Sequence, residues 1–158
     1  MQQTLDYANR KTEQAEIMLG RSESFSLSAD QGKIDKYQVS NARSIGVRLI
    51  KGNQVGISYT ENIDTKSLQE MVDLAIENAN LMKEDPHQKI IPPGKNKKLI
   101  NTHPKNFYDD KTETRKKIDL CLSLDSKIMA LDPRIKGAPY NGYGESTGES
   151  YILNSEGL

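Results

Sequence analysis

Residues 16–40 read EIMLGRSESFSLSADQGKIDKYQVS, and the alternation within this stretch decides the fold class that we predict. Phe25, Leu27 and Ala29 alternate with serines, which is typical of a strand that has one face toward water. The Gln-Gly pair that follows predicts a tight turn, since glycine adopts a positive φ without steric cost. We therefore expect a β-hairpin here.

The pattern continues in both directions along the chain. Residues 33–40 alternate again, with a change of phase between Ile34 and Tyr37 that hints at a β-bulge. Residues 45–50 are apolar and β-branched, and a tight turn at residues 51–53 leads to a further alternating stretch. In that stretch the inward side chains are expected to be Val55, Ile57 and Tyr59. The short spacings favour an antiparallel meander of about four strands.

Three segments have helical spacing. Residues 2–14 predict a short, weakly amphipathic helix. The clearest apolar stripe runs over residues 68–82, where Ser67 to Glu70 fits a capping box and Asp64 is a rival N-cap. Residues 112–131 predict another helix, whose apolar stripe would consist of Ile118, Cys121, Leu124, Ile128 and Leu131.

The predicted fold class is therefore α+β, with the meander flanked by helices. A further strand pair is expected near the C-terminus, joined by a Gly-rich link. We expect residues 1–158 to form the N-terminal domain of a longer protein, because the chain stops at a turn-like Asn-Ser-Glu-Gly. Within it we expect a helix-meander-helix unit over 1–84, an extended Pro-containing crossover over 85–111, and a helix plus strand pair over 112–158.

Composition excludes several function classes. Lys+Arg and Asp+Glu both number 22, so no net basic field supports direct binding of nucleic acid. The N-terminus lacks the pattern of a signal peptide, and no apolar run approaches the roughly 18 residues needed to span a bilayer. A single cysteine, Cys121, forms no intrachain disulfide. A soluble, cytoplasmic protein without membrane contact is expected.

The search for chemistry finds no complete site. His87, His103 and Cys121 are the only imidazole and thiol groups, and no H-E-x-x-H or C-x-x-C spacing joins them. We interpret both histidines as solvated loop residues and the cysteine as a buried structural thiol. We expect no catalytic, cofactor-binding or metal-binding residues, and the sequence leaves the substrate-binding residues unknown.

Two further motifs have ordinary explanations. The run Y-N-G-Y-G-E-S-T-G superficially resembles a phosphate-binding loop, but it lacks G-K-[ST] and no helical pattern follows it, so hairpin turns explain it better. A lysine cluster could contact an anionic partner, although acidic neighbours follow closely and a solvated loop is the default. Its members are Lys95, Lys97, Lys98 and Lys105.

The order of these elements resembles the opening of the TldD/PmbA family. The resemblance lies in residues 15–40, in S-I-G-V-R-L-I-K-G-N-Q-V-G-I-S-Y-T, in the Leu68-to-Met82 helix and in the final S-Y-I-L-N-S-E-G-L. The Asp-Pro-His region and the long crossover look more like the PmbA (TldE) branch. The resemblance implies a two-domain cytosolic protein that forms homo- or heterodimers with a TldD/PmbA-like subunit.

The same resemblance implies a zinc peptidase site, a His-Glu-x-x-x-His helix plus a cysteine, only in the C-terminal half of TldD-like members. No position of this sequence matches it, so no cofactor is expected in this segment. We expect a non-catalytic domain that cradles an unfolded peptide and supports subunit assembly. The alternative is a free-standing regulatory module that acts on DNA gyrase, the family's older label, or on another protein partner.

Overall fold

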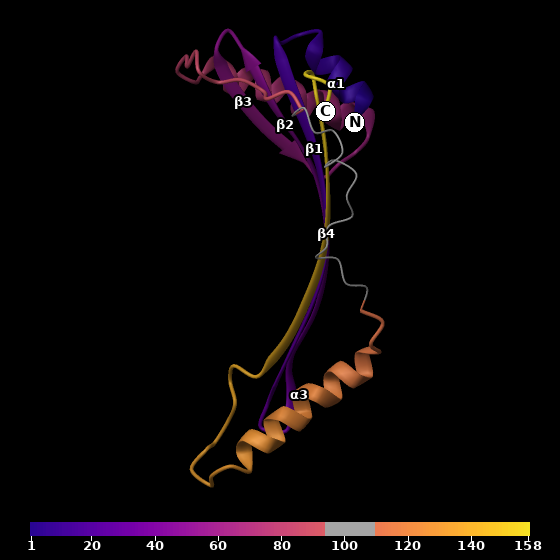
Figure 1. Cartoon of the computed structure of the whole chain (residues 1–158), viewed down its shortest axis with the longest axis vertical. Helices are drawn as coiled ribbons and strands as arrows, with labels where there is room; N and C mark the ends of the chain where they lie inside the picture. Colours follow the sequence, from indigo (N-terminus) through magenta and orange to yellow (C-terminus); the bar gives the residue numbers. More distant parts are fainter. Residues whose placement is uncertain (94–109) are drawn as a thin grey trace. The chain divides into compact units, whose positions relative to one another are not determined.

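A computed structural model describes residues 1–93 and 110–158 (Figure 1). The four described strands form one sheet in the order β3-β2-β1-β4. The predicted α+β class, an antiparallel four-stranded sheet with flanking helices, is confirmed. In chain order the elements are α1 Gln2–Asn9, β1 Gln14–Asp30, β2 Lys33–Lys51, β3 Gln54–Thr60, α2 Thr65–Asn80, α3 Thr114–Met129 and β4 Gly142–Asn154.

Tight turns set the antiparallel pairing of β1, β2 and β3. Gln31 and Gly32 have φ of 52° and 75°, and Gly52 and Asn53 have φ of 57° and 63°, the left-handed conformations that a two-residue hairpin turn needs. The predicted turns are thereby confirmed, and β2 pairs with β3 from Ile45 opposite Thr60 to its end.

Strand β4 also runs antiparallel to β1. The Ser155 N–H donates to the Ala15 carbonyl, and the Ala29 N–H donates to the Asn141 carbonyl. Residue numbers therefore rise along one strand as they fall along the other, which defines an antiparallel arrangement.

The sheet has fewer and longer strands than the sequence indicated. Residues 33–40 and 45–50 belong to one strand, β2, because the intervening Asn-Ala-Arg-Ser contains no glycine or proline to interrupt it. The expected C-terminal strand pair is likewise one strand, β4. The glycines at 142, 144 and 148 belong to this strand and do not form a turn. A Cβ on Gly142 would lie 3.2 Å from the Leu27 carbonyl oxygen, so β4 packs closely against β1 at this position.

The chain divides into two compact units. The described residues of the first unit are 1–21, 43–93 and 149–158, and those of the second are 22–42 and 110–148. The long strands β1, β2 and β4 contribute residues to both units. Each unit has its own helices and its own hydrophobic cluster.

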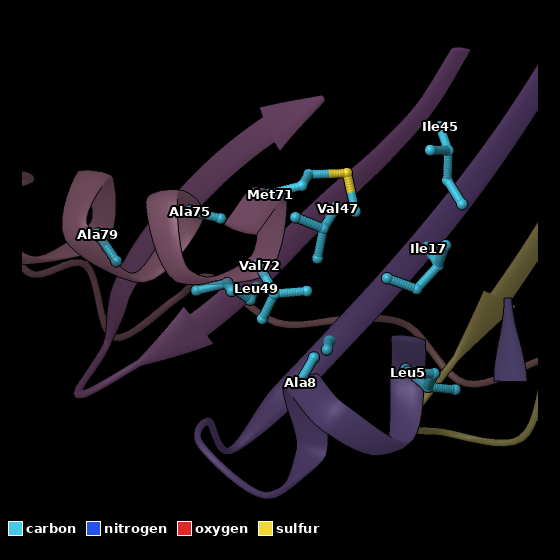
Figure 2. Packing of buried hydrophobic residues seen from close by; sticks show 11 residues of the cluster. Leu5, Ala8, Ile17, Ile45, Val47, Leu49, Met71, Val72, Ala75 and Ala79 are labelled. Atoms are coloured by element: carbon cyan, nitrogen blue, oxygen red, sulfur yellow. The ribbon is translucent and has the colours of Figure 1, made fainter. Parts of the chain in front are cut away.

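In the first unit, α1 and α2 cover one face of the sheet (Figures 1 and 2). The core lies between them and the strands, and its buried members are Leu5, Ala8, Ala15, Ile17, Ile45, Val47, Leu49, Met71, Val72, Ala75 and Ala79. Helix α2 starts at the rival cap: the Asp64 carboxylate accepts from the Ser67 N–H at 3.0 Å and from its hydroxyl at 2.6 Å.

The prediction that Ile57 and Tyr59 on β3 point inward is wrong. Ile57 and Tyr59 are 61% and 75% exposed, and Gly56 and Ser58 instead face α2. A Cβ on Gly56 would lie 1.8 Å from the Ala75 carbonyl oxygen. The absence of a side chain therefore lets the backbone of α2 lie directly on β3, and the bulky residues face away.

The crossover begins as an ordered segment of the first unit. The Ile90 N–H donates to Gln14 Oε1 at 2.9 Å, and Arg48 donates to the Lys89 carbonyl at 3.3 Å. Ile90 is buried, whereas Ile91 is 72% exposed.

In the second unit, α3 packs on the hairpin end of β1 and β2 and on β4 (Figure 1). Its cluster joins Leu27, Ala29 and Cys121, with Phe25 and Tyr143 partly buried against it. The predicted apolar stripe of α3 is partly wrong, because Leu124 and Leu131 are exposed. The buried row is instead Lys117, Cys121 and Asp125. No helix in the described part of the chain is long and apolar enough to cross a membrane.

Candidate functional site

The second unit contains an open groove of about 430 Å³. This volume lies within the range typical of ligand sites. The groove combines two aromatic rings and a valine with carboxylate, amide and hydroxyl groups. Its described lining is Glu23, Ser24, Phe25, Val39, Asn41, Asp110, Tyr143, Glu145, Ser146 and Thr147.

A buried ammonium organises one wall of this groove. The side chain of Lys117 is 7% exposed, and its Nζ lies 2.7 Å from both oxygens of Glu145 and 3.0 Å from Asp110 Oδ2. The Tyr143 hydroxyl donates to Glu145 Oε2 at 2.6 Å and lies 3.2 Å from Asp110 Oδ2. Four polar groups, from α3, from β4 and from Asp110 in the segment before α3, therefore form one network.

The electrostatics of the network follow from these contacts. Hydrogen bonds from the Thr112 hydroxyl and N–H, and then from Lys117, hold the pKa of Asp110 well below its ordinary value. The carboxylate of Glu145, followed by that of Asp110, raises the pKa of Lys117 above its ordinary value despite the burial of the ammonium. The hydrogen bond to Glu145, together with burial, raises the pKa of Tyr143 to about 12. At neutral pH the lysine is therefore charged and the phenol neutral.

Local structure places these groups. Tyr143 and Glu145 are two residues apart on β4, so both point to the same face of the sheet. Phe25 is on β1, and its ring centroid is 6.0 Å from that of Tyr143 and 5.3 Å from that of Tyr37. The Lys117 Nζ lies 5.9 Å from the Phe25 ring centroid, so the ammonium contacts aromatic surface as well as carboxylates.

The sequence interpretation missed this cluster because Lys117 and Glu145 are 28 positions apart and no spacing rule joins them. The one available signal was that Lys117, Cys121 and Asp125 are spaced four residues apart. That row includes two charged residues, so hydropathy alone favours the neighbouring leucines.

Among the described residues, His87 and Cys121 do not belong to a metal site. His87 is exposed, its backbone N–H donates to Asp85, and His103 lies outside the described residues. Cys121 is 2% exposed, and burial raises the pKa of its thiol, as expected for a structural cysteine. Within residues 1–93 and 110–158, no three His, Cys, Asp or Glu side chains are grouped so that they could hold a metal ion. The zinc chemistry of a metallopeptidase therefore does not fit the described residues.

The lysine cluster that supported a regulatory module also falls outside the described part. Lys95, Lys97, Lys98 and Lys105 all belong to residues 94–109. The groove therefore remains the better-supported site.

A smaller hollow of about 250 Å³ lies in the first unit between α1 and the start of α2. The polar groups beside it serve the packing of these helices: Lys11 Nζ lies 2.6 Å from Asp73, and the Tyr7 hydroxyl donates to Asp73 at 2.9 Å. These contacts tie α1 to α2 and are already satisfied, so the hollow is the weaker candidate.

Two family models match the chain. Residues 15–79 match PmbA/TldA metallopeptidase domain 1, and residues 107–158 match the PmbA/TldA metallopeptidase central domain. No protein of curated function matches the chain by sequence.

Solved structures share the fold at low identity. TldE from Thermococcus kodakarensis is 18% identical, with a TM-score of 0.78 over 100% of this chain and 35% of its own. A candidate modulator of DNA gyrase from Bacteroides thetaiotaomicron is 18% identical, with a TM-score of 0.79, and the match covers 99% of this chain and 36% of that one. Another candidate modulator, from Thermotoga maritima, is 17% identical, with a TM-score of 0.77, and the match covers 99% of this chain and 36% of that one. The chain thus spans about a third of the length of these structures.

Proposed function

Because the chain belongs to the PmbA/TldD metallopeptidase family, we propose that it is a non-catalytic part of a peptidase system that holds an unfolded peptide and supports subunit assembly. The observation that carries this proposal is the open groove of the second unit. Its lining mixes ring faces, carboxylates, hydroxyls and an amide, which is the mixture that an extended peptide with varied side chains requires.

The position of β4 supports the peptide as occupant. Among the described strands it lies at an edge of the sheet, and its residues Glu145, Ser146 and Thr147 line the groove. An extended peptide can add its backbone hydrogen bonds to an edge strand while neighbouring pockets take its side chains. Such binding tolerates many sequences, as the handling of unfolded chains demands.

The chemistry of the groove favours binding over catalysis. Lys117 is held charged by two carboxylates, so its ammonium is a poor base and a poor nucleophile. The Tyr143 phenol, with its pKa raised to about 12, is neutral and already donates to a carboxylate. Among the described residues these contacts account for the charges of Lys117, Asp110 and Glu145 without any catalytic role.

The peptidase activity would then belong to an assembly. We propose a cytoplasmic setting and a dimer with a TldD/PmbA-like subunit, with zinc bound by residues outside this chain. The buried, reduced thiol of Cys121 is compatible with that compartment. One solved structure of similar fold is a TldE.

A peptidase assay tests the non-catalytic assignment. The chain is incubated with stoichiometric zinc and dye-labelled unfolded peptides. Binding should be detected by a rise in anisotropy, and the peptides should stay intact over hours. Robust zinc-dependent hydrolysis that is lost with chelator would sink the proposal, and a chain with Phe25→Asp serves as the groove control.

The second candidate function is a regulatory module that acts on DNA gyrase. It draws on the two solved structures that are described as candidate gyrase modulators. Purified gyrase, assayed for supercoiling with and without the chain, tests it directly. A dose-dependent change in supercoiling without any peptide binding would favour this function over the peptide cradle.

A further inference from the structure

The charge of the groove indicates which peptides it prefers. Three of its described lining residues, Glu23, Asp110 and Glu145, are acidic, and none is basic. Lys117 behind the wall supplies one positive charge, so the described lining together with Lys117 has an excess of two negative charges. A surface with this excess attracts cations and disfavours anions.

The shape of the lining matches a long cationic side chain. The rings of Phe25 and Tyr143 lie next to the carboxylates and offer apolar surface for a methylene stem. A cation above such rings gains a further favourable interaction, and Lys117 already uses both rings in this way from its own side, at 5.9 and 5.6 Å. The groove therefore combines an apolar wall with acceptors at its rim.

We propose that this groove selects extended peptide segments that carry a lysine or arginine, with the cationic head directed to the carboxylates and the stem on the aromatic rings. This inference rests on the proposed peptide-cradling function and specifies its substrate class. Glu23 is the natural partner of the incoming cation, because it is exposed, whereas Asp110 and Glu145 already bind Lys117.

A three-peptide series tests the proposal. The peptides share one unstructured sequence and differ only in a central Lys, Gln or Glu, and each carries a single tryptophan. Because the chain contains no tryptophan, the peptide fluorescence reports binding alone. The lysine peptide should bind more tightly than the glutamine peptide, and the glutamate peptide most weakly, with the differences shrinking as salt is raised.

The variant Glu23→Gln localises the effect. Loss of one exposed carboxylate should weaken the lysine peptide about two- to five-fold and leave the glutamine peptide nearly unchanged. The matched control is Glu61→Gln, which removes an exposed carboxylate of the first unit and should change neither affinity.

The outcomes separate the two proposals. Equal affinity for all three peptides, or an equal effect of both variants, would overturn the charge selectivity while leaving the peptide cradle intact. Failure of every peptide to bind would overturn the proposed function and the selectivity together.

Discussion

Lys117 is a buried charge whose neighbours satisfy it. Its ammonium has two carboxylate partners and two aromatic neighbours, so little of its hydrogen-bonding capacity is unmet. A buried charge with such partners orients the groups around it and fixes where their lone pairs point.

Replacing this lysine should destabilise the second unit. Lys117→Met keeps the length of the side chain but leaves Asp110 and Glu145 without their cation, which should lower the Tm by about 5–10 °C at pH 7. The control Lys116→Met removes an exposed charge from the next position and should have little effect. Calorimetry at pH 7 and pH 4 checks both.

The pH dependence of that variant has a definite sign. Protonation of the orphaned carboxylates removes their charge, so the gap between wild type and Lys117→Met should narrow toward pH 4. A difference in Tm between wild type and Lys117→Met that grows on acidification would contradict the ion pairs of Lys117 with Asp110 and Glu145.

Tyr143 makes a separate alkaline prediction. Its pKa is raised from 10.0 to about 12, so the stability it contributes is present below pH 10 and is lost as the pH rises from 10 to 12. A phenolate titration by ultraviolet absorbance should show a step near pH 12. Tyr143→Phe should abolish that step, and a step that survives in the variant would refute the assignment.

At the scale of elements, the contact between α2 and β3 depends on one glycine. Gly56→Ala would place a Cβ 1.8 Å from a backbone oxygen that cannot move independently of the helix. The expected cost is about 1–3 kcal/mol of unfolding free energy. Gly46→Ala is the matched control in the neighbouring strand, where the new Cβ would lie 3.5 Å from the nearest atom and should be tolerated. Urea denaturation of both variants measures the two costs. Equal stabilities would contradict the close packing of α2 on β3 at Gly56.

Two isoleucines of the first-unit sheet differ in burial and can be compared directly. Ile17 is fully buried on β1, and Ile57 is 61% exposed on β3. Ile17→Ala should cost about 2–5 kcal/mol, and Ile57→Ala should stay within about 0.5 kcal/mol. Comparable losses in denaturation experiments would mean that the face of β3 is assigned wrongly.

These elements also show what sequence alone could predict. Turns and helices follow from local rules, so the Gln31-Gly32 turn and the α2 stripe up to Ala79 were predictable, whereas Asp64 was one of two candidate caps and Met82 is exposed. Alternation identifies two faces of a strand but does not say which one a helix covers, and this is why Ile57 was placed inward. Runs without a glycine or proline between them merge into one strand, as β2 shows. The groove was out of reach because its partners meet only in the folded chain.

At the scale of the whole chain, three strands supply residues to both units, while the helices each belong to one. The first unit contains the larger hydrophobic cluster, and the second contains the groove and its charged network. Each of the two family models covers residues of both units. The division into 1–84, 85–111 and 112–158 stays a prediction.

The most direct test of the peptide cradle is a residue-resolved binding map. Isotope-labelled chain is titrated with the unstructured lysine peptide, and backbone amide shifts are followed by NMR. The largest shifts should fall on Glu23, Phe25, Val39 and residues 143–147, and the residues of the α1–α2 hollow should not shift. Shifts confined to the first unit, or no shifts at saturating peptide, would contradict peptide binding in the groove.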